Sequence, residues 1–197
     1  MNIHETMFRC ATATILVSFA IVRAYYGRRV ARESVETGRA QNRDRSYYRV
    51  IGGTYMLTFA YLLTPWLDFA HIRLPVGLRC FGVPVAFAGV AMIWWTHKAL
   101  GRQWSGILEL RANHRLIIAG PYHRIRHPMY TGFFLLPVGM ALSTANLLLG
   151  LLQIGATVAM YLARVNDEEA MMLDHFGDEY RAYMRRTGRL LPRFQGK

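Results

Sequence analysis

Residues 129–162 read MYTGFFLLPVGMALSTANLLLGLLQIGATVAMYL, an apolar run divided by the polar break Ser143-Thr144-Ala145-Asn146. A helix needs about 20 mostly apolar residues to cross a bilayer, so this run is too long for one span and slightly short for two. A tight helical hairpin with Asn146 near its tip fits best. We therefore expect one helix over residues 129–144 and a second over residues 147–163.

Further apolar blocks of spanning length precede the hairpin, over residues 8–26, 48–70 and 76–96. Arg23 lies near the end of the first block, where its long side chain can reach the interface. Trp94 and Trp95 end the third block, as interfacial aromatic residues often do. Together with the hairpin, the blocks predict an all-α polytopic membrane protein with about five transmembrane helices in a single domain, residues 1–197.

The formal net charge of +12 fits either a nucleic-acid partner or a membrane protein with basic cytoplasmic loops, and the apolar blocks favour the second. Arginines gather in Gly27–Tyr47, in Lys98–Pro128 and in the tail from Arg164 onward. The positive-inside rule places these segments in the cytoplasm, with the N-terminus outside and the C-terminus inside. Arginine far outnumbers lysine, and Ala and Gly are abundant, a composition that GC-rich genomes favour. We therefore expect a bacterial source and location in the inner membrane. We expect no nucleic-acid partner and no obligate protein partner.

Residues 165–186 change character, because charges appear on one side of a helical pattern. Gly177 interrupts the pattern, and Gly188 and Pro192 end it. These features predict an amphipathic cytoplasmic helix, or a pair of helices, lying against the membrane domain. Its apolar and aromatic positions recur close to the helical period: Met172, Leu173, Phe176, Tyr180, Tyr183 and Met184.

Polar groups gather in two segments that adjoin apolar spans, where polar side chains in a bilayer usually mark a functional site. The first, Gly120–Gly132, is a donor-rich turn that leads into an apolar helix with Pro128 in its first turn. The free N–H groups of that helix start suit a carboxylate or hydroxyls. Tyr122, His127 and Tyr130 add aromatic faces and hydrogen-bonding groups.

The second polar segment is Arg164-Val165-Asn166-Asp167-Glu168-Glu169, directly after the last apolar block. Arg164 and Glu168 are four residues apart and share one face of a helix. They form either an ordinary ion pair at the membrane boundary or a pair of ligand-binding groups that face a pocket between helices. We expect no metal site, because the chain has no dense histidine cluster and Pro128 interrupts the helix near His127.

The ordered motifs Arg126-His127-Pro128-x-Tyr130-x-Gly132, Glu168-Glu169-x-x-x-Leu173 and Phe176-Gly177-x-Glu179-Tyr180-x-x-Tyr183 resemble the isoprenylcysteine carboxyl methyltransferase family. They are also similar to the related membrane phospholipid N-methyltransferases. The resemblance extends over roughly Asn113 to Pro192. It implies binding of S-adenosylmethionine (SAM) without a Rossmann fold, and the sequence indeed has no G-x-G-x-x-G motif after a strand.

The resemblance also implies roles for single residues. The stretch 114–117 corresponds to the adenosine end of the cofactor site, the stretch 127–130 to its methionine end, and Glu168 to the acid that holds the cofactor. Arg164 corresponds to an arginine directed towards the methyl acceptor, which makes it the catalytic candidate. The implied cofactor-binding residues are His114, Arg115, Leu116, Ile117, Tyr122, His127, Pro128, Met129, Tyr130, Glu168 and Glu169.

The implied function is SAM-dependent methyl transfer to a lipophilic acceptor at the cytoplasmic face of the membrane. The leading expectation for the acceptor is the carboxylate of an isoprenylcysteine-like or other isoprenoid or lipid substrate. One alternative is an NADPH-dependent sterol or isoprenoid reductase, since such enzymes have a similar Arg-His-Pro-x-Tyr signature. The acidic pair Glu168-Glu169 and the lack of an extra basic pocket for a 2′-phosphate favour SAM. The other alternative is a non-enzymatic membrane scaffold.

Overall fold

The structure, a computed structural model, describes residues 3–30, 41–101 and 115–193. Within them the chain forms helices, short 3-10 turns and isolated β-bridges, but no strand. The all-α expectation is therefore confirmed for the described residues. The helices are α1 (Ile3–Val30), α2 (Gln41–Leu63), α3 (Val76–Leu100), α4 (Pro128–Thr144), α5 (Leu147–Phe176) and α6 (Asp178–Arg186), with 3-10 turns η1 (Asp68–Ala70) and η3 (Gly120–His123).

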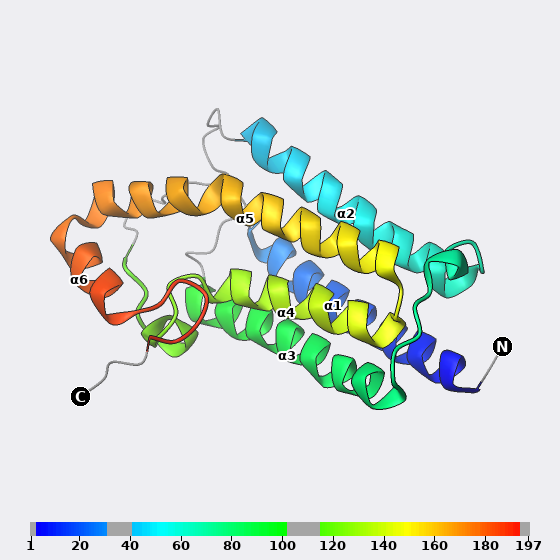
Figure 1. Cartoon of the computed structure of the whole chain (residues 1–197). Coiled ribbons are helices and arrows are strands. Elements are labelled where there is room, and N and C mark those ends of the chain that lie inside the picture. The colour runs from blue at the N-terminus through cyan, green and yellow to red at the C-terminus, as the bar shows by residue number, and fades with distance from the viewer. Residues whose placement is uncertain (1–2, 31–40, 102–114, 194–197) are drawn as a thin grey trace.

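The long helices lie side by side in one bundle (Figure 1). α3 packs along α4, α5 lies against both α4 and α2, and α1 crosses α3 and α4. α6 turns back beside the end of α5, at the end of the bundle where α4 begins. The buried core is formed where α1, α3 and α4 meet, by Ile15, Leu16, Ala86, Val90, Ile93, Leu136 and Met140.

Glycines let the backbones of α3 and α4 approach closely. A Cβ atom added to Gly139 would lie 2.2 Å from the backbone nitrogen of Ala86, and one added to Gly89 would lie 2.6 Å from that of Leu136. Helices in a bilayer gain little from the hydrophobic effect between them, so such contacts of small residues supply much of their packing. The α3–α4 pair is thus the rigid base on which the start of α4 is held.

The tip of the α4–α5 hairpin follows the expected design. Ala145 adopts a left-handed conformation with φ of 50°, and the Asn146 side chain caps α5 by accepting a hydrogen bond from the Leu149 amide at 3.1 Å. Its amide nitrogen also donates to the Leu67 carbonyl at 2.7 Å. Asn146 therefore both starts α5 and joins the hairpin tip to the loop between α2 and α3.

Length and hydropathy mark three of the described helices as able to cross a membrane: Ile3–Arg28, Val76–Leu100 and Leu147–Phe176. These apolar helices make the chain an integral membrane protein. α4 and α2 are not among these three helices. α4 has only 17 residues, and the first turns of α2 are charged, so length and hydropathy support three of the five expected spans.

Two expected boundaries are wrong. The second apolar block does not continue as a helix to residue 70, because α2 ends at Leu63, and Thr64 precedes Pro65, whose ring disfavours helical backbone before it. The fifth helix does not end at residue 163 with a separate helix after it. α5 is one helix of 30 residues as far as Phe176, and the break comes at Gly177, whose φ is 52°. The acidic pair therefore stands on the membrane helix itself.

The close α3–α4 contact predicts the effect of a single methyl group. Gly139→Ala should lower the thermal stability of the detergent-purified protein, because overpacking costs about 1–3 kcal/mol and each kcal/mol shifts the melting temperature by roughly 2–4 °C. Gly155→Ala in α5 is the matched control, since an added Cβ there meets nothing within 4 Å. Equal melting temperatures for the two variants would show that α3 and α4 do not pack this closely.

Candidate functional site

The end of α5 carries two neighbouring carboxylates that face different surroundings. Successive residues of an α-helix are about 100° apart around its axis, so the side chains of Glu168 and Glu169 leave the helix in different directions. Glu168 comes 21 residues after Leu147 and hence about 32 Å along the helix. Because the hydrocarbon core of a bilayer is about 30 Å thick, this pair falls near its edge if α5 crosses it.

Glu169 is the centre of an ion-pair network, with only 6% of its side chain exposed. Arg189 donates hydrogen bonds to both carboxylate oxygens, from Nη2 at 2.6 Å and from Nε at 3.1 Å. Arg126 donates from its Nε at 3.1 Å, and Nε2 of His127 lies 3.2 Å from Oε1. The network joins α5 to the segment before α4 and to the tail after α6.

Glu168 is held from other sides and remains more accessible, with 21% of its side chain exposed. The Tyr130 hydroxyl donates to its Oε1 at 2.7 Å, and the Nε of Arg164 donates to the same atom at 3.2 Å. Nδ1 of His127 lies 3.5 Å from the other oxygen. Of the two carboxylates, Glu168 is therefore the one that a ligand can reach.

His127 lies between the two carboxylates, directly before α4. Burial alone would lower the pKa of this imidazole, but the adjacent carboxylates of Glu168 and Glu169 outweigh burial and raise it above its usual value. A protonated imidazole donates a hydrogen bond from each nitrogen, which suits a ring with a carboxylate on either side. A protonated His127 therefore links Glu168 to Glu169 through one positive charge.

Backbone hydrogen bonds fix the tail alongside the segment that leads into α4. The amide of Arg126 donates to the Gly188 carbonyl at 2.7 Å, and that of His127 donates to the Arg189 carbonyl at 2.9 Å. Ile125 and Gly188 form a parallel β-bridge. The tail thereby carries Arg189 to Glu169, although the two residues are on different elements.

Tyr122 is attached to the same assembly through α6. The hydroxyl of Tyr183 donates to the Tyr122 carbonyl at 2.7 Å. Burial raises the pKa of the Tyr122 hydroxyl, and the nearby charge of Glu168 adds to the rise, so this hydroxyl is neutral and lies within electrostatic reach of Glu168.

The structure brings together most of the residues expected in the site. Tyr122, His127, Tyr130, Arg164, Glu168 and Glu169 converge, while Pro128 and Met129 lie in the first turn of α4 beside them. Leu116 and Ile117 are half-buried and Arg115 is exposed in the stretch that leads to η3. His114 lies outside the described residues.

Sequence reasoning missed the function of Arg189 and Tyr183. The sequence indicates Arg189 only as a topological arginine of the basic tail, and Tyr183 only as part of an apolar pattern and of a family motif, without a contact for either. The sequence contains only an indirect indication of these contacts. Two acids at the end of a membrane helix need several positive partners, and few arginines near the helix can supply them. Which arginine does so depends on the return of the tail, which the sequence pattern does not specify.

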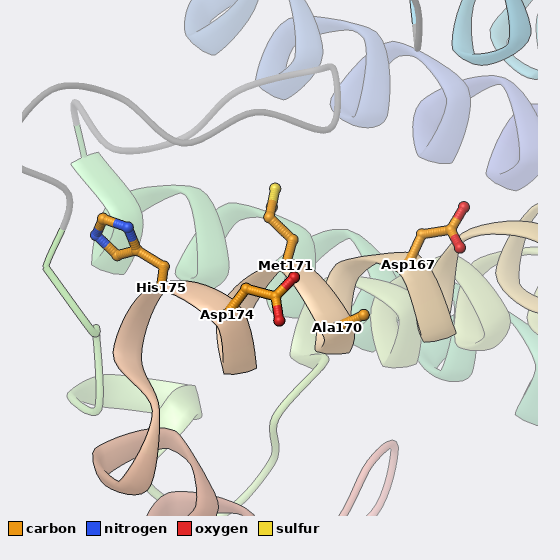
Figure 2. A pocket seen from close by; sticks show the side chains of 5 residues that line it. All are labelled: Asp167, Ala170, Met171, Asp174 and His175. Carbon is orange, nitrogen blue, oxygen red and sulfur yellow. The ribbon is translucent and has the colours of Figure 1, made fainter.

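A shallow, open cavity of about 470 Å³ borders the same part of α5. Figure 2 shows Asp167, Ala170, Met171, Asp174 and His175 along this side of the helix. Glu168 is three residues before Met171 and seven before His175, so it shares their face of α5. Glu168 itself does not line this cavity, whereas the carboxylates of Asp167 and Asp174 do.

Part of the chain is similar in sequence to proteins of a known family. Residues 82–174 match the sequence model of the isoprenylcysteine carboxyl methyltransferase (ICMT) family. Over 94 residues the chain is 31% identical to the protein-S-isoprenylcysteine O-methyltransferase of Schizosaccharomyces pombe, a match that covers 47% of this chain and 40% of that protein. Over 112 residues it is 30% identical to the nickel-cobalt-cadmium resistance protein NccN of Alcaligenes xylosoxydans, covering 56% of this chain and 52% of that protein.

The chain therefore matches about half, or less, of the length of these curated relatives. A solved structure of the eukaryotic intramembrane Ras methyltransferase ICMT superposes with a TM-score of 0.59, covering 92% of this chain and 67% of that one. At 20% sequence identity this likeness concerns the fold alone. The matched residues 82–174, a little under half of the chain, contain most of α3, all of α4, His127 and the acidic pair of α5, and over this segment the chain is similar to the isoprenylcysteine carboxyl methyltransferase family.

Proposed function

We propose that the chain transfers a methyl group from SAM to a lipophilic acceptor, and that Glu168 holds the cofactor. The observation that carries this proposal is the state of Glu168: it is fixed by Tyr130, Arg164 and His127, yet 21% of its side chain stays exposed. A carboxylate held in place by three groups and still accessible is preorganised to bind a cation.

The residues present fit the chemistry of SAM. The cofactor has a sulfonium, an ammonium and a carboxylate, besides the ribose hydroxyls, and Glu168 can accept hydrogen bonds from its ammonium or hydroxyl groups. The network of Arg126, Arg164 and Arg189 exceeds Glu168 and Glu169 by one positive charge even before His127 is counted, which suits the cofactor carboxylate. The carboxylates of Asp167 and Asp174, in the cavity beside α5, suit the positive groups of the cofactor.

The remaining cofactor contacts are inferred from the similarity to this family. The stretch Arg115, Leu116 and Ile117, preceded by His114, would line the adenosine end. Tyr122 and the start of α4, with Pro128, Met129 and Tyr130, would line the methionine end. Glu169 has a different part: because its oxygens are engaged by Arg126, Arg189 and His127, it acts as a positioning residue.

When bound, SAM supplies an activated methyl group that is displaced in line by the acceptor atom. The chain's own contribution is to align that atom at about 3 Å from its target and to exclude water. Arg164 is buried one helical turn before Glu168, and its planar guanidinium can orient an acceptor carboxylate through paired N–H groups. No protein nucleophile is needed for such a transfer.

The membrane setting defines the acceptor class. In this proposal α1 to α5 cross the bilayer as one domain, with the N-terminus outside and the site at the cytoplasmic face. An acceptor then arrives from the bilayer, with its apolar chain among the helices and its reacting group at the level of Arg164. The leading acceptor is the carboxylate of an isoprenylcysteine-like or other isoprenoid or lipid molecule.

The assignment predicts cofactor binding that depends on Glu168. Detergent-purified protein should bind SAM and its demethylated product in isothermal titration calorimetry, but not NADPH. Glu168→Gln should weaken SAM binding by about tenfold or more, because a charge-assisted hydrogen bond contributes about 1.5–3 kcal/mol. Glu179→Gln removes the same charge from an exposed position of α6 and should leave SAM affinity unchanged.

The other outcomes each contradict the proposal in a specific way. Binding of NADPH without SAM would assign the chain to the reductase alternative. Failure of both ligands to bind the folded protein would favour the scaffold alternative. Equal SAM affinity for Glu168→Gln and the unmodified chain would remove Glu168 from the cofactor site.

Arg164 is expected to affect transfer more than cofactor binding. Arg164→Lys keeps the charge next to Glu168 but loses the planar fork, so the incorporation of radiolabelled methyl groups into membrane lipid extracts should fall by about tenfold or more. Arg181→Lys, on the exposed face of α6, is the control. Undiminished labelling by Arg164→Lys would show that Arg164 does not orient the acceptor.

A further inference from the structure

A second cavity, of about 480 Å³, lies beside η3 and is lined by basic side chains. His123 and Arg124 come from the segment before α4, Arg186 from the end of α6, and Arg193 from the tail. None of the residues that line it is acidic. Basic groups from three segments of the chain thus surround one cavity.

The cavity walls are held together by the contacts that also support the acidic site. Tyr183, in the wall, donates to the carbonyls of Tyr122 and Ile125, and Thr187 donates to the carbonyl of Tyr183 at 2.8 Å. Arg193 donates to the carbonyl of Arg185 at 3.0 Å, which places the tail against α6. The convergence of positive charges is therefore a product of the fold.

These arginines lack an acidic partner in the described part of the chain. The ion pairs there do not include Arg124, Arg186 or Arg193, whereas Arg181 on the opposite side of α6 pairs with Asp178 at 2.7 Å. Several converging positive charges without a carboxylate attract an anion, and the guanidinium fork matches the oxygens of a phosphate.

We propose that this cavity binds a phosphate-bearing anion, and that the headgroup of an anionic membrane phospholipid is the source favoured by its position. The cavity lies at the end of the bundle where α4 begins, as the acidic site does, and hence near the edge of the hydrocarbon core. Anionic headgroups concentrate at that depth and attract basic clusters. SAM carries no phosphate, and the residues that line this cavity are not among the cofactor contacts proposed above.

The cavity also corrects one expectation from the sequence. The chain was expected to lack an additional basic pocket, and this was one argument against NADPH. Since such a pocket exists, NADPH belongs among the probes, and the phosphate site and the SAM assignment must be tested separately.

The test uses the full chain in detergent and compares ligands that differ in the phosphate. Dioctanoyl phosphatidylglycerol should bind, while dioctanoylglycerol, with the same tails and no phosphate, should not. The double variant Arg124→Gln/Arg186→Gln should weaken phosphatidylglycerol binding by about tenfold or more, since each basic residue near a lipid surface contributes about 1 kcal/mol. Both side chains are exposed, so the variant should keep the melting temperature of the unmodified chain.

The matched control is Arg181→Gln/Arg185→Gln, which removes two exposed arginines from α6 that do not line the cavity. It should bind phosphatidylglycerol as the unmodified chain does. Equal loss in the two double variants, or equal binding of dioctanoylglycerol, would overturn the proposal, because binding would then reflect general surface charge or the acyl chains.

Competition identifies the source of the phosphate. If inorganic phosphate does not displace phosphatidylglycerol at millimolar concentration, the lipid is the ligand; if it does, the site takes free phosphate as well. Displacement by NADPH that depends on Arg124 and Arg186 would support the phosphate site and contradict the SAM assignment. SAM binding should be unchanged in Arg124→Gln/Arg186→Gln, so the two proposals can fail independently.

Discussion

The carboxylate of Glu169 is almost wholly buried at the end of a helix long enough to cross a membrane. A charge in that position costs several kcal/mol unless oppositely charged groups surround it. Arg126, Arg189 and His127 meet this requirement, and each reaches Glu169 only if its own segment takes a particular path. The constraint therefore places the start of α4 and the tail around α5, and the rest of the site is built on that arrangement.

The adjacent acid is freed for another purpose by the same arrangement. Arg126 and Arg189 bind Glu169. Glu168 contacts Arg164, Tyr130 and the second nitrogen of His127, and part of its side chain stays exposed. α5 is one unbroken helix from Leu147 to Phe176, so both carboxylates are fixed relative to the membrane core. Two neighbouring acids on one helix thus divide into a supporting group and a group available to a ligand.

Local features of the site could be predicted from the sequence, whereas its long-range features could not. The hairpin at Asn146, the start of α4 at Pro128 and the pairing of Arg164 with Glu168 depend on neighbouring residues, and the structure has all three. The length of α5 was underestimated because the pattern becomes polar after residue 163, although no helix-breaking residue occurs before Gly177. The pairing of Arg189 with Glu169 depends on the left-handed turn at Gly177 and on the bridge at Gly188, and hydrophobic periodicity specifies neither. Of the expected cofactor contacts, His114 lies outside the described residues.

Hydrogen exchange at the backbone amides of Arg126 and His127 tests the central role of Glu169 most directly. These amides donate to the carbonyls of Gly188 and Arg189, so they should be protected only while the tail is held against the segment before α4. In Glu169→Gln the loss of a buried charge partner, worth about 3–5 kcal/mol, should speed their exchange by at least about tenfold, while α3 keeps its protection. Unchanged protection of both amides in Glu169→Gln would contradict the account, because the tail would then be held by something other than this carboxylate.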